Sequence, residues 1–218
     1  MLLHPLSCRP RRQETLEIKA IFNQAFIFRT MFCLSLLEHS LPVPPHLLNR
    51  PLADAIKGEL ERLFLDKVIS NLGLCISVYD IRSIDGGFIV PGDGSATYKV
   101  MFRLVMFQPF VGEILSGKIE RSDATGLHVS LGFFSDIFIP AHLIVQPSEL
   151  EADGIWVWKY DGSELPLDLN EEIHFQVTNI KYPSIPAEQD ENAKPFSPME
   201  IVGTINGDGL GLLSWWAD

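Results

Sequence analysis

The chain has 218 residues, 46% of them hydrophobic, a length that suits one large domain or two small ones. Its most apolar stretch, from Phe102 to Leu115, is interrupted by polar residues and Pro109, so it falls short of the roughly 18 to 20 apolar residues of a membrane helix. The formal net charge of −11 argues against a protein that grips duplex DNA by itself, because neutralising phosphates requires a basic face. We expect no membrane partner, and a chain that docks on a basic partner or sits in a large assembly.

The first thirty residues differ from the rest in charge. Residues 1–30 carry a net charge of +3, from Arg9, Arg11, Arg12, Lys19 and Arg29 against Glu14 and Glu17, which leaves −14 for the remainder. Their apolar run follows the acidic residues, which is not the order of a secretory signal. We expect a disordered N-terminal extension over 1–30. A mitochondrial presequence, an added segment and an upstream start codon before Met31 are the open explanations.

Cysteine and histidine spacing gives no sign of a metal site. Cys8, Cys33 and Cys75 form no C-x-x-C pair, which excludes a zinc ribbon and argues against a disulfide framework. The six histidines show no H-E-x-x-H or other paired spacing. A Ser-His-Asp triad requires proximity only in space, so spacing cannot exclude one, but no G-x-S-x-G motif is present. We expect no metal, no cofactor and no catalytic residue.

Residues 31–110 have the pattern of a small α+β domain. A strand is expected over Met31–Glu38, followed by a turn forced by the prolines at 42, 44 and 45. Pro51 suits the first turn of a helix whose apolar residues recur at helical spacing as far as Val68, and Asn71 and Gly73 are expected to close it. Three further strands are expected at Leu74–Ile81, Gly87–Val90 and Thr97–Phe107.

Residues 111–218 are expected to be all-β. Short apolar runs separated by Gly, Asp and Asn are typical of a small barrel. The expected strands are Glu113–Arg121, Gly126–Leu131, Asp136–Pro140, Ile155–Lys159, Glu172–Ile180 and Met199–Ile205. The segment 183–198 is rich in proline and acidic residues, so we expect a flexible insertion that buries too little apolar surface to order itself.

Three runs in the second half resemble the opening strands of an OB-fold RNA-binding barrel: GEILSGKI from Gly112, GLHVSLG from Gly126 and IFIP from Ile137. Upstream, PGDG from Pro91, VMFRLV from Val100 and FQPF from Phe107 resemble the tip domain of the polymerase stalk subunits that eukaryotes and archaea share. The tail motifs GFFSDI, IWVW and GLGLLSWW, the last ending at Trp216, are similar to the RNA polymerase III member rather than to its polymerase I or II relatives.

The resemblance covers the chain from Met31 to the C-terminus, and it implies a fold and a role. The fold would be an α+β tip domain over 31–110 followed by an OB-fold barrel over 111–218. The chain would be a non-catalytic stalk subunit of nuclear RNA polymerase III, supporting initiation on genes for small non-coding RNAs. Its partners would be a smaller helical stalk subunit, the polymerase III core, initiation factors and nascent single-stranded RNA. The alternatives are a stalk subunit of another nuclear polymerase and a free-standing OB-fold RNA-binding protein.

A contact with single-stranded RNA would fall on the first barrel strands. Lys118, Arg121 and His128 are the basic side chains there, and aromatic rings on OB folds stack on bases. Phe133 and Phe134 either form such a stacking platform or join the core. The acidic background predicts weak, salt-sensitive RNA binding.

The loop of Pro91, Gly92, Asp93 and Gly94 is either a plain hairpin turn or, as the family implies, an element that docks on the polymerase core. It lacks the third glycine and the following helix of a dinucleotide-binding fingerprint. Trp156 and Trp158 lie two residues apart, so they share one face of a strand. That face either closes the barrel core or meets a partner.

Overall fold

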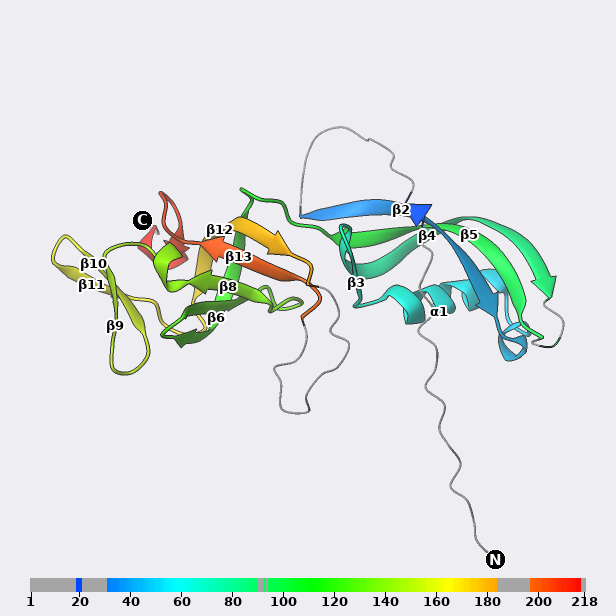
Figure 1. Ribbon diagram of the computed structural model, residues 1–218, viewed down its shortest axis with the longest axis horizontal. Helices are drawn as coiled ribbons and strands as arrows, with labels where there is room; N and C mark the ends of the chain where they lie inside the picture. The colour runs from blue at the N-terminus through cyan, green and yellow to red at the C-terminus, as the bar shows by residue number, and fades with distance from the viewer. Residues whose placement is uncertain (1–18, 21–30, 90–91, 93, 184–196, 217–218) are drawn as a thin grey trace, which may run out of the picture.

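The computed structural model describes residues 19–20, 31–89, 92, 94–183 and 197–216. Two domains lie end to end along the long axis of the molecule (Figure 1). One contains the single α-helix of the described residues, and the other is a closed barrel. This arrangement confirms the predicted α+β class with a C-terminal barrel. In the described part, no helix is long and apolar enough to cross a membrane.

The tip domain is an antiparallel sheet with a helix on one face. Its strand order is β1-β2-β5-β4-β3. The elements are β1 (Lys19–Ala20), β2 (Phe32–Val43), the 3-10 helix η1 (Pro45–Leu47), α1 (Leu52–Phe64), β3 (Val68–Ile69), β4 (Gly73–Ile89) and β5 (Ala96–Phe107). Of the extension expected at 1–30, only β1 is described, paired with β2 at Glu38 and Leu37.

Helix α1 is shorter than its apolar pattern predicts. Ala55, Ile56, Leu60 and Phe64 are buried on one face, at the spacing that packs a helix onto a sheet. The helix ends at Phe64, because the next residue is extended and Asp66 adopts a left-handed φ of 56°. The predicted continuation to Val68 and closure at Asn71 and Gly73 are therefore wrong. Val68 belongs instead to the short strand β3.

The two long strands of the tip hairpin also differ from prediction. The strands expected at Leu74–Ile81 and Gly87–Val90 are one continuous strand, β4, whose pairing with β5 shifts register at four bulges. Gly86 and Gly87, with φ of 100° and 93°, let β4 bend without ending. The turn expected at the three prolines begins later than predicted, at Pro44 and the 3-10 helix η1. Strand β2 runs through Pro42, which is tolerated because β1 covers this edge only at Leu37 and Glu38.

The barrel consists of short antiparallel strands and one parallel pair. Its sheet order is β13-β8-β7-β6-β12-β14, and a further β12–β13 pairing closes the circle. Its strands are β6 (Ile114–Asp123), β7 (Gly126–Ser130), β8 (Ile137–Pro140), β12 (Glu172–Lys181), β13 (Glu200–Thr204) and β14 (Gly211–Leu212), with 3-10 helices η2 (Ala141–Leu143) and η3 (Leu213–Trp215). Most of the insertion expected at 183–198 lies outside the described residues.

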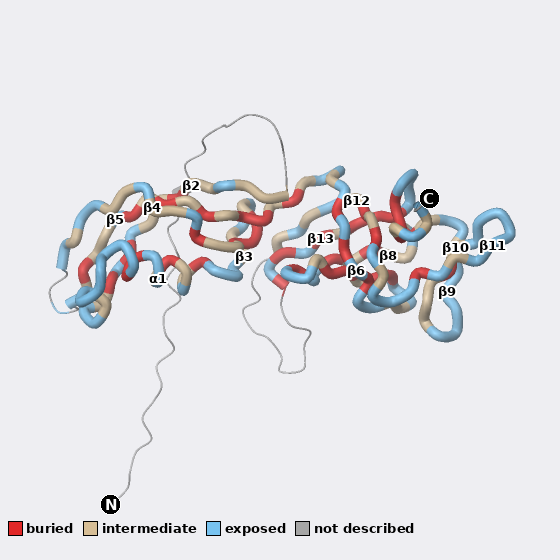
Figure 2. The backbone as a smooth tube through the Cα atoms, turned by 180° about the vertical axis from the view of Figure 1, so that it is seen from behind, coloured by how far each residue is buried: buried red, intermediate tan, exposed pale blue. Residues whose placement is uncertain are grey.

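A separate three-stranded sheet extends from the end of the barrel that is remote from the tip domain (Figures 1 and 2). It contains β9 (Ser148–Leu150), β10 (Trp156–Tyr160) and β11 (Ser163–Pro166), with β10 in the centre. The strand predicted at Ile155–Lys159 therefore exists, but it does not belong to the barrel wall. Strands β9 and β11 have too few apolar residues to be predicted.

The two domains share apolar packing where they meet. Phe107, the last residue of β5, and Leu74 of β4 belong to the same buried cluster as the barrel core. The link between β5 and β6 is also fixed by backbone bonds, since the Gln108 N–H donates to the Met31 carbonyl and the Gly112 N–H to the Val177 carbonyl, each at 2.7 Å. The link itself is buried at Phe107 and Pro109 but exposed at Val111 and Gly112, so the tube in Figure 2 changes to pale blue before it enters the barrel.

Candidate nucleic-acid interface

A bulge in β6 brings the predicted cations to one face of the barrel. Lys118 pairs with Ser130 of β7 and Arg121 with His128, with a register shift between Ile119 and Arg121. In a regular strand, residues three apart point to opposite faces, but the extra residue of a bulge reverses the alternation. Lys118, Arg121 and His128 consequently share the outer surface, as the RNA-binding interpretation requires.

Each of these basic side chains lies near a carboxylate. Lys118 Nζ lies 3.8 Å from the Glu172 carboxylate. The guanidinium of Arg121 lies 2.7 Å from His128 Nε2 and 3.7 Å from the carboxylate of Asp123. The Thr125 hydroxyl and N–H and the nearby His128 lower the pKa of Asp123, so this carboxylate stays ionised at neutral pH. The face therefore has little net positive charge.

The two phenylalanines after β7 have separate positions. Phe134 is buried in the barrel core, 7% exposed, so its ring is not accessible for stacking on a base. Phe133 is half-exposed, and its ring lies 5.0 Å from that of Phe107 and 5.8 Å from that of Phe32. Phe133 therefore packs against the tip domain, and only its remaining exposed surface could contact RNA.

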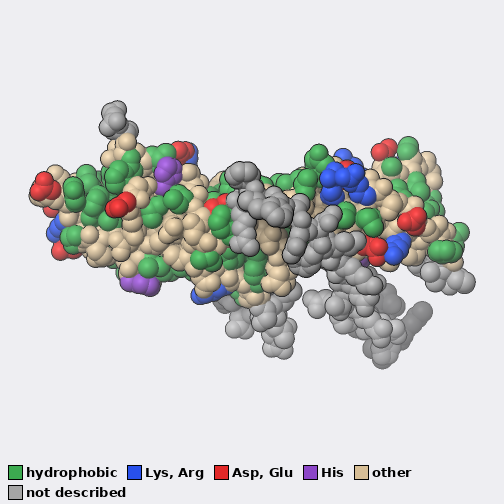
Figure 3. All heavy atoms as spheres, turned by 90° about the horizontal axis from the view of Figure 1, so that it is seen from above, with side chains coloured by type: hydrophobic (Ala, Val, Ile, Leu, Met, Phe, Trp, Pro, Cys, Tyr) green, Lys and Arg blue, Asp and Glu red, His purple; other side chains and the backbone are tan. Residues whose placement is uncertain are grey.

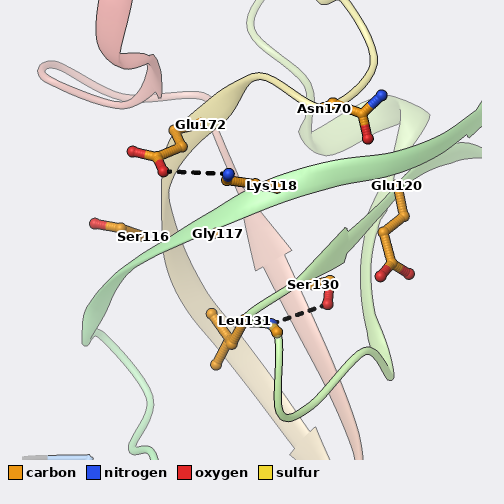
Figure 4. A pocket seen from close by; sticks show the side chains of 9 residues that line it. Ser116, Gly117, Lys118, Glu120, Ser130, Leu131, Asn170 and Glu172 are labelled. Carbon is orange, nitrogen blue, oxygen red and sulfur yellow. Dashed lines mark hydrogen bonds and ion pairs between the residues drawn. The ribbon is translucent and has the colours of Figure 1, made fainter.

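A polar hollow of about 420 Å³ lies beside Lys118 (Figure 4). Its walls are β6, the end of β7 and the turn before β12, and its lining side chains are mainly hydroxyl, amide and carboxylate groups. Figure 4 shows Lys118 directed toward Glu172, and the Ser130 hydroxyl accepting a bond from the Gly132 N–H at 3.0 Å. Glu120 and Glu172 make the hollow better suited to base edges, which offer hydrogen-bond donors, than to phosphate.

The free end of the tip hairpin is apolar. Phe88 and Ile89, at the end of β4, are 77% and 66% exposed, and both precede the predicted docking loop. Gly92 and Gly94 of that loop have φ of 94° and 71°, while Pro91 and Asp93 lie outside the described residues. Neighbouring exposed apolar side chains often mark an interaction site. The sequence analysis did not predict a role for Phe88 and Ile89. The alternation of apolar and polar residues along a strand does not show where the strand extends past the helix that covers the sheet.

The two thiols that the structure describes fit a structural role. Cys75 is fully buried, and burial raises the pKa of its thiol to about 11. Cys33 is half-buried, with its sulfur 3.5 Å from Gln108 Oε1. Among the described residues, no group of three or more His, Cys, Asp and Glu side chains could hold a metal ion.

The two domains match known families separately. The profile "RNA polymerase III subunit Rpc25" matches residues 113–216, and the "SHS2 domain found in N terminus of Rpb7p/Rpc25p/MJ0397" matches residues 38–94. The chain is also 40% identical over 201 residues to the DNA-directed RNA polymerase III subunit RPC8 of Bos taurus, an alignment that covers 85% of this chain and 98% of the relative. The chain belongs to the RNA polymerase III subunit Rpc25 family.

Other relatives support placement in the Rpc25 family rather than in a sister family. The RNA polymerase III subunit rpc8 of Schizosaccharomyces pombe is 36% identical over 202 residues, covering 85% of this chain and the whole relative. The RNA polymerase II subunit RPB7 of Saccharomyces cerevisiae is 29% identical over 140 residues, or 64% of this chain and 74% of the relative. This confirms the expected resemblance. The match to the Rpc25 model extends through Trp215 and Trp216. Together with Trp158, these residues line a second candidate site, which the sequence analysis did not predict.

Proposed function

We propose that this chain is the larger, non-catalytic stalk subunit of a nuclear RNA polymerase III, supporting initiation on genes for small non-coding RNAs. The supporting observation is the coverage of its relatives. Three proteins named RNA polymerase III subunit RPC8 align with it over 98–100% of their length, so both the tip domain and the barrel have counterparts in them. The proposed partners are a smaller helical subunit, with which it forms a heterodimer, the polymerase III core and initiation factors.

Recovery of a tagged chain from nuclear extract, followed by mass spectrometry, tests this proposal. We expect the polymerase III core subunits and one small helical subunit in stoichiometric amounts. Polymerase I or II core subunits would assign the chain to a sister complex. Ribosomes or nucleases would instead indicate a free-standing RNA-binding protein.

In the proposed assembly the hairpin end of the tip domain docks on the polymerase core. Phe88 and Ile89 supply apolar surface at that end, next to the loop at 91–94. Changing both to Ser should lower recovery of core subunits but leave thermal stability nearly unchanged, because neither side chain is buried. Tyr79→Ala is a matched control, since Tyr79 is 57% exposed on the same strand but lies farther from the loop. Equal loss of core subunits in the control would contradict docking by the hairpin end.

We also propose that the β6–β7 face contacts single-stranded RNA. The supporting observation is the bulge that places Lys118 and Arg121 on one face. Replacing both by Ala in the stalk heterodimer should weaken RNA binding and reduce the slope of log K against log salt by about 1.4, since each phosphate contact on single strands contributes about 0.7. Lys159→Ala, which removes an exposed cation from β10, should leave the slope unchanged. Unchanged RNA binding in the double variant would contradict the proposal and would indicate that this face contacts proteins instead.

A further inference from the structure

An aromatic hollow of about 570 Å³ lies where the small sheet meets the end of the chain. Strand β10 supplies Trp158 and Tyr160, and the segment from β14 to the 3-10 helix η3 and beyond supplies Trp215 and Trp216. The Trp158 ring lies 4.9 Å from that of Trp215 and 4.8 Å from that of Tyr160, so the rings form a continuous surface. Figure 1 places this region at the end of the barrel remote from the tip domain.

Contacts within the chain hold this surface in shape. Trp156, two residues before Trp158 on β10, donates from Nε1 to the Asp123 carbonyl at 3.0 Å and thereby anchors β10 to the barrel. Gly211 has a φ of 100°, and a Cβ there would lie 2.3 Å from the Trp215 ring, so only glycine permits the observed packing. Trp216 Nε1 donates to the Leu210 carbonyl at 3.2 Å. The hollow is thus largely preformed.

Its rim carries aromatic surface that the barrel core does not use. Trp156 and Trp215 are partly buried and pack against the core cluster. Tyr160 and Trp216, in contrast, are 59% and 53% exposed while still lining the hollow. Two large exposed aromatic side chains beside one concave surface are characteristic of an interaction site, because Trp and Tyr are the usual energetic anchors of interfaces.

The charge of the hollow and of the small sheet that forms one of its sides indicates the kind of partner. Asp208 lines the hollow itself. From Ser148 to Asp168 the chain has one basic residue, Lys159, which is already bonded to Glu149. The same stretch contains six acidic residues, Glu149, Glu151, Asp153, Asp161, Glu164 and Asp168. On the face drawn in Figure 3 the most prominent group of basic side chains lies over the tip domain rather than over the barrel.

This excess of carboxylates attracts a cationic partner and repels nucleic acid. We propose that the aromatic hollow binds an extended, arginine-containing segment of a partner protein. A guanidinium stacks flat on an indole ring, is attracted by the ring's negative face, and satisfies nearby carboxylates with its remaining N–H groups. Tyr160 and Trp216 flank the segment, and Asp208 provides a carboxylate within the hollow. This site is separate from the tip hairpin and from the β6–β7 face, so it goes beyond the proposed function.

Titration of the full chain with synthetic peptides tests the proposal. The probe is a ten-residue peptide of alternating arginine and glycine, and the comparison peptides replace arginine by glutamate or by proline. Binding is followed by the indole N–H signals of the four tryptophans in a proton–nitrogen NMR spectrum. The variants are Tyr160→Ala and Trp216→Ala, and the control is Tyr79→Ala, an equally exposed tyrosine of the tip domain.

We expect the arginine peptide to shift the Trp158, Trp215 and Trp216 signals more than that of Trp156. Each hollow variant should weaken binding about fivefold, the contribution of one cation–π contact at a partly exposed site. The thermal midpoint of Tyr160→Ala should stay near the wild-type value, whereas Trp216→Ala should lose no more stability than its bond to the Leu210 carbonyl provides. Binding should also weaken as salt is raised. No binding, unchanged affinity in both variants, or equal shifts with the proline peptide would overturn the proposal. Equal shifts with a single-stranded RNA oligonucleotide would overturn it in favour of nucleic acid.

Discussion

Replacing Phe107 by Ala should uncouple the two domains. The Phe107 side chain is fully buried, and its ring lies 5.0 Å from that of Phe133, 5.5 Å from Phe134 and 5.8 Å from Phe32. Truncating a buried phenylalanine to alanine lowers the free energy of unfolding by about 3–5 kcal/mol, and each aromatic pair accounts for about 0.5–1.5 kcal/mol of that. This is a large part of the roughly 5–15 kcal/mol that stabilises a domain.

The chain provides a separate reporter for each domain. All four tryptophans lie in residues 111–218, so their fluorescence follows the barrel. Among the described residues α1 is the only α-helix, so circular dichroism at 222 nm is weighted toward the tip domain. In urea the two signals should change together in the wild type and separately in Phe107→Ala. Phe64→Ala, which empties the tip core but leaves the junction intact, should lower both midpoints together.

Coincident transitions in Phe107→Ala, or a loss below about 1 kcal/mol, would refute the reasoning. Either result would mean that the coupling between the barrel and the tip domain does not depend on the packing of this ring.

Three further predictions concern single side chains. Burial raises the pKa of Glu113, so the stability that its protonated form provides is present at low pH and is lost as pH rises through the raised folded value. Glu113→Gln should therefore gain stability relative to wild type between pH 4 and pH 7 in urea titrations. A stability difference that stays constant over this pH range would contradict the prediction. Trp158 Nε1 is buried without a hydrogen-bond partner among the described residues, whereas Trp156 Nε1 is bonded. Trp158→Phe should therefore lower the unfolding free energy by less than Trp156→Phe, which loses a hydrogen bond worth about 1 kcal/mol. The reverse order of the two variants would refute this prediction. Gly211→Ala should destabilise the barrel by about 1–3 kcal/mol through backbone strain and displacement of Trp215, visible as a lower thermal midpoint and altered fluorescence. An unchanged midpoint would show that Trp215 can move away from the new methyl group at no cost in stability.

The regular barrel strands and the amphipathic helix were predictable, because their apolar residues recur with a clear period. The alternation in β6 and β12 and the spacing of Ile56, Leu60 and Phe64 are examples. The end of α1 was not predictable, since it depends on Asp66 adopting a left-handed conformation, which aspartate does only in some contexts. The continuity of β4 depends similarly on bulges whose positions tertiary packing decides.

The candidate sites show the same division. The residue types at the RNA face could be read from the sequence, but their common orientation depends on the bulge between Ile119 and Arg121. Phe133 and Phe134 are adjacent and chemically identical, yet one packs against the tip domain and the other in the barrel core. Trp158 and Trp215 are 57 positions apart in the printed sequence, and only the fold brings their rings together.

The packed junction has a mechanical consequence. The segment from Gln108 to Glu113 is bonded at both ends, to Met31 on one side and to Val177 on the other, and Phe107 is clamped between rings from both domains. A force that rotates the hairpin end is therefore resisted by close-packed side chains, because the two domains are not joined by a flexible linker alone. Rotation of one domain relative to the other requires four aromatic rings to repack. The chain then behaves as a lever arm. A small angular displacement of the tip domain becomes a larger linear displacement of the aromatic hollow, which lies at the far end of the barrel.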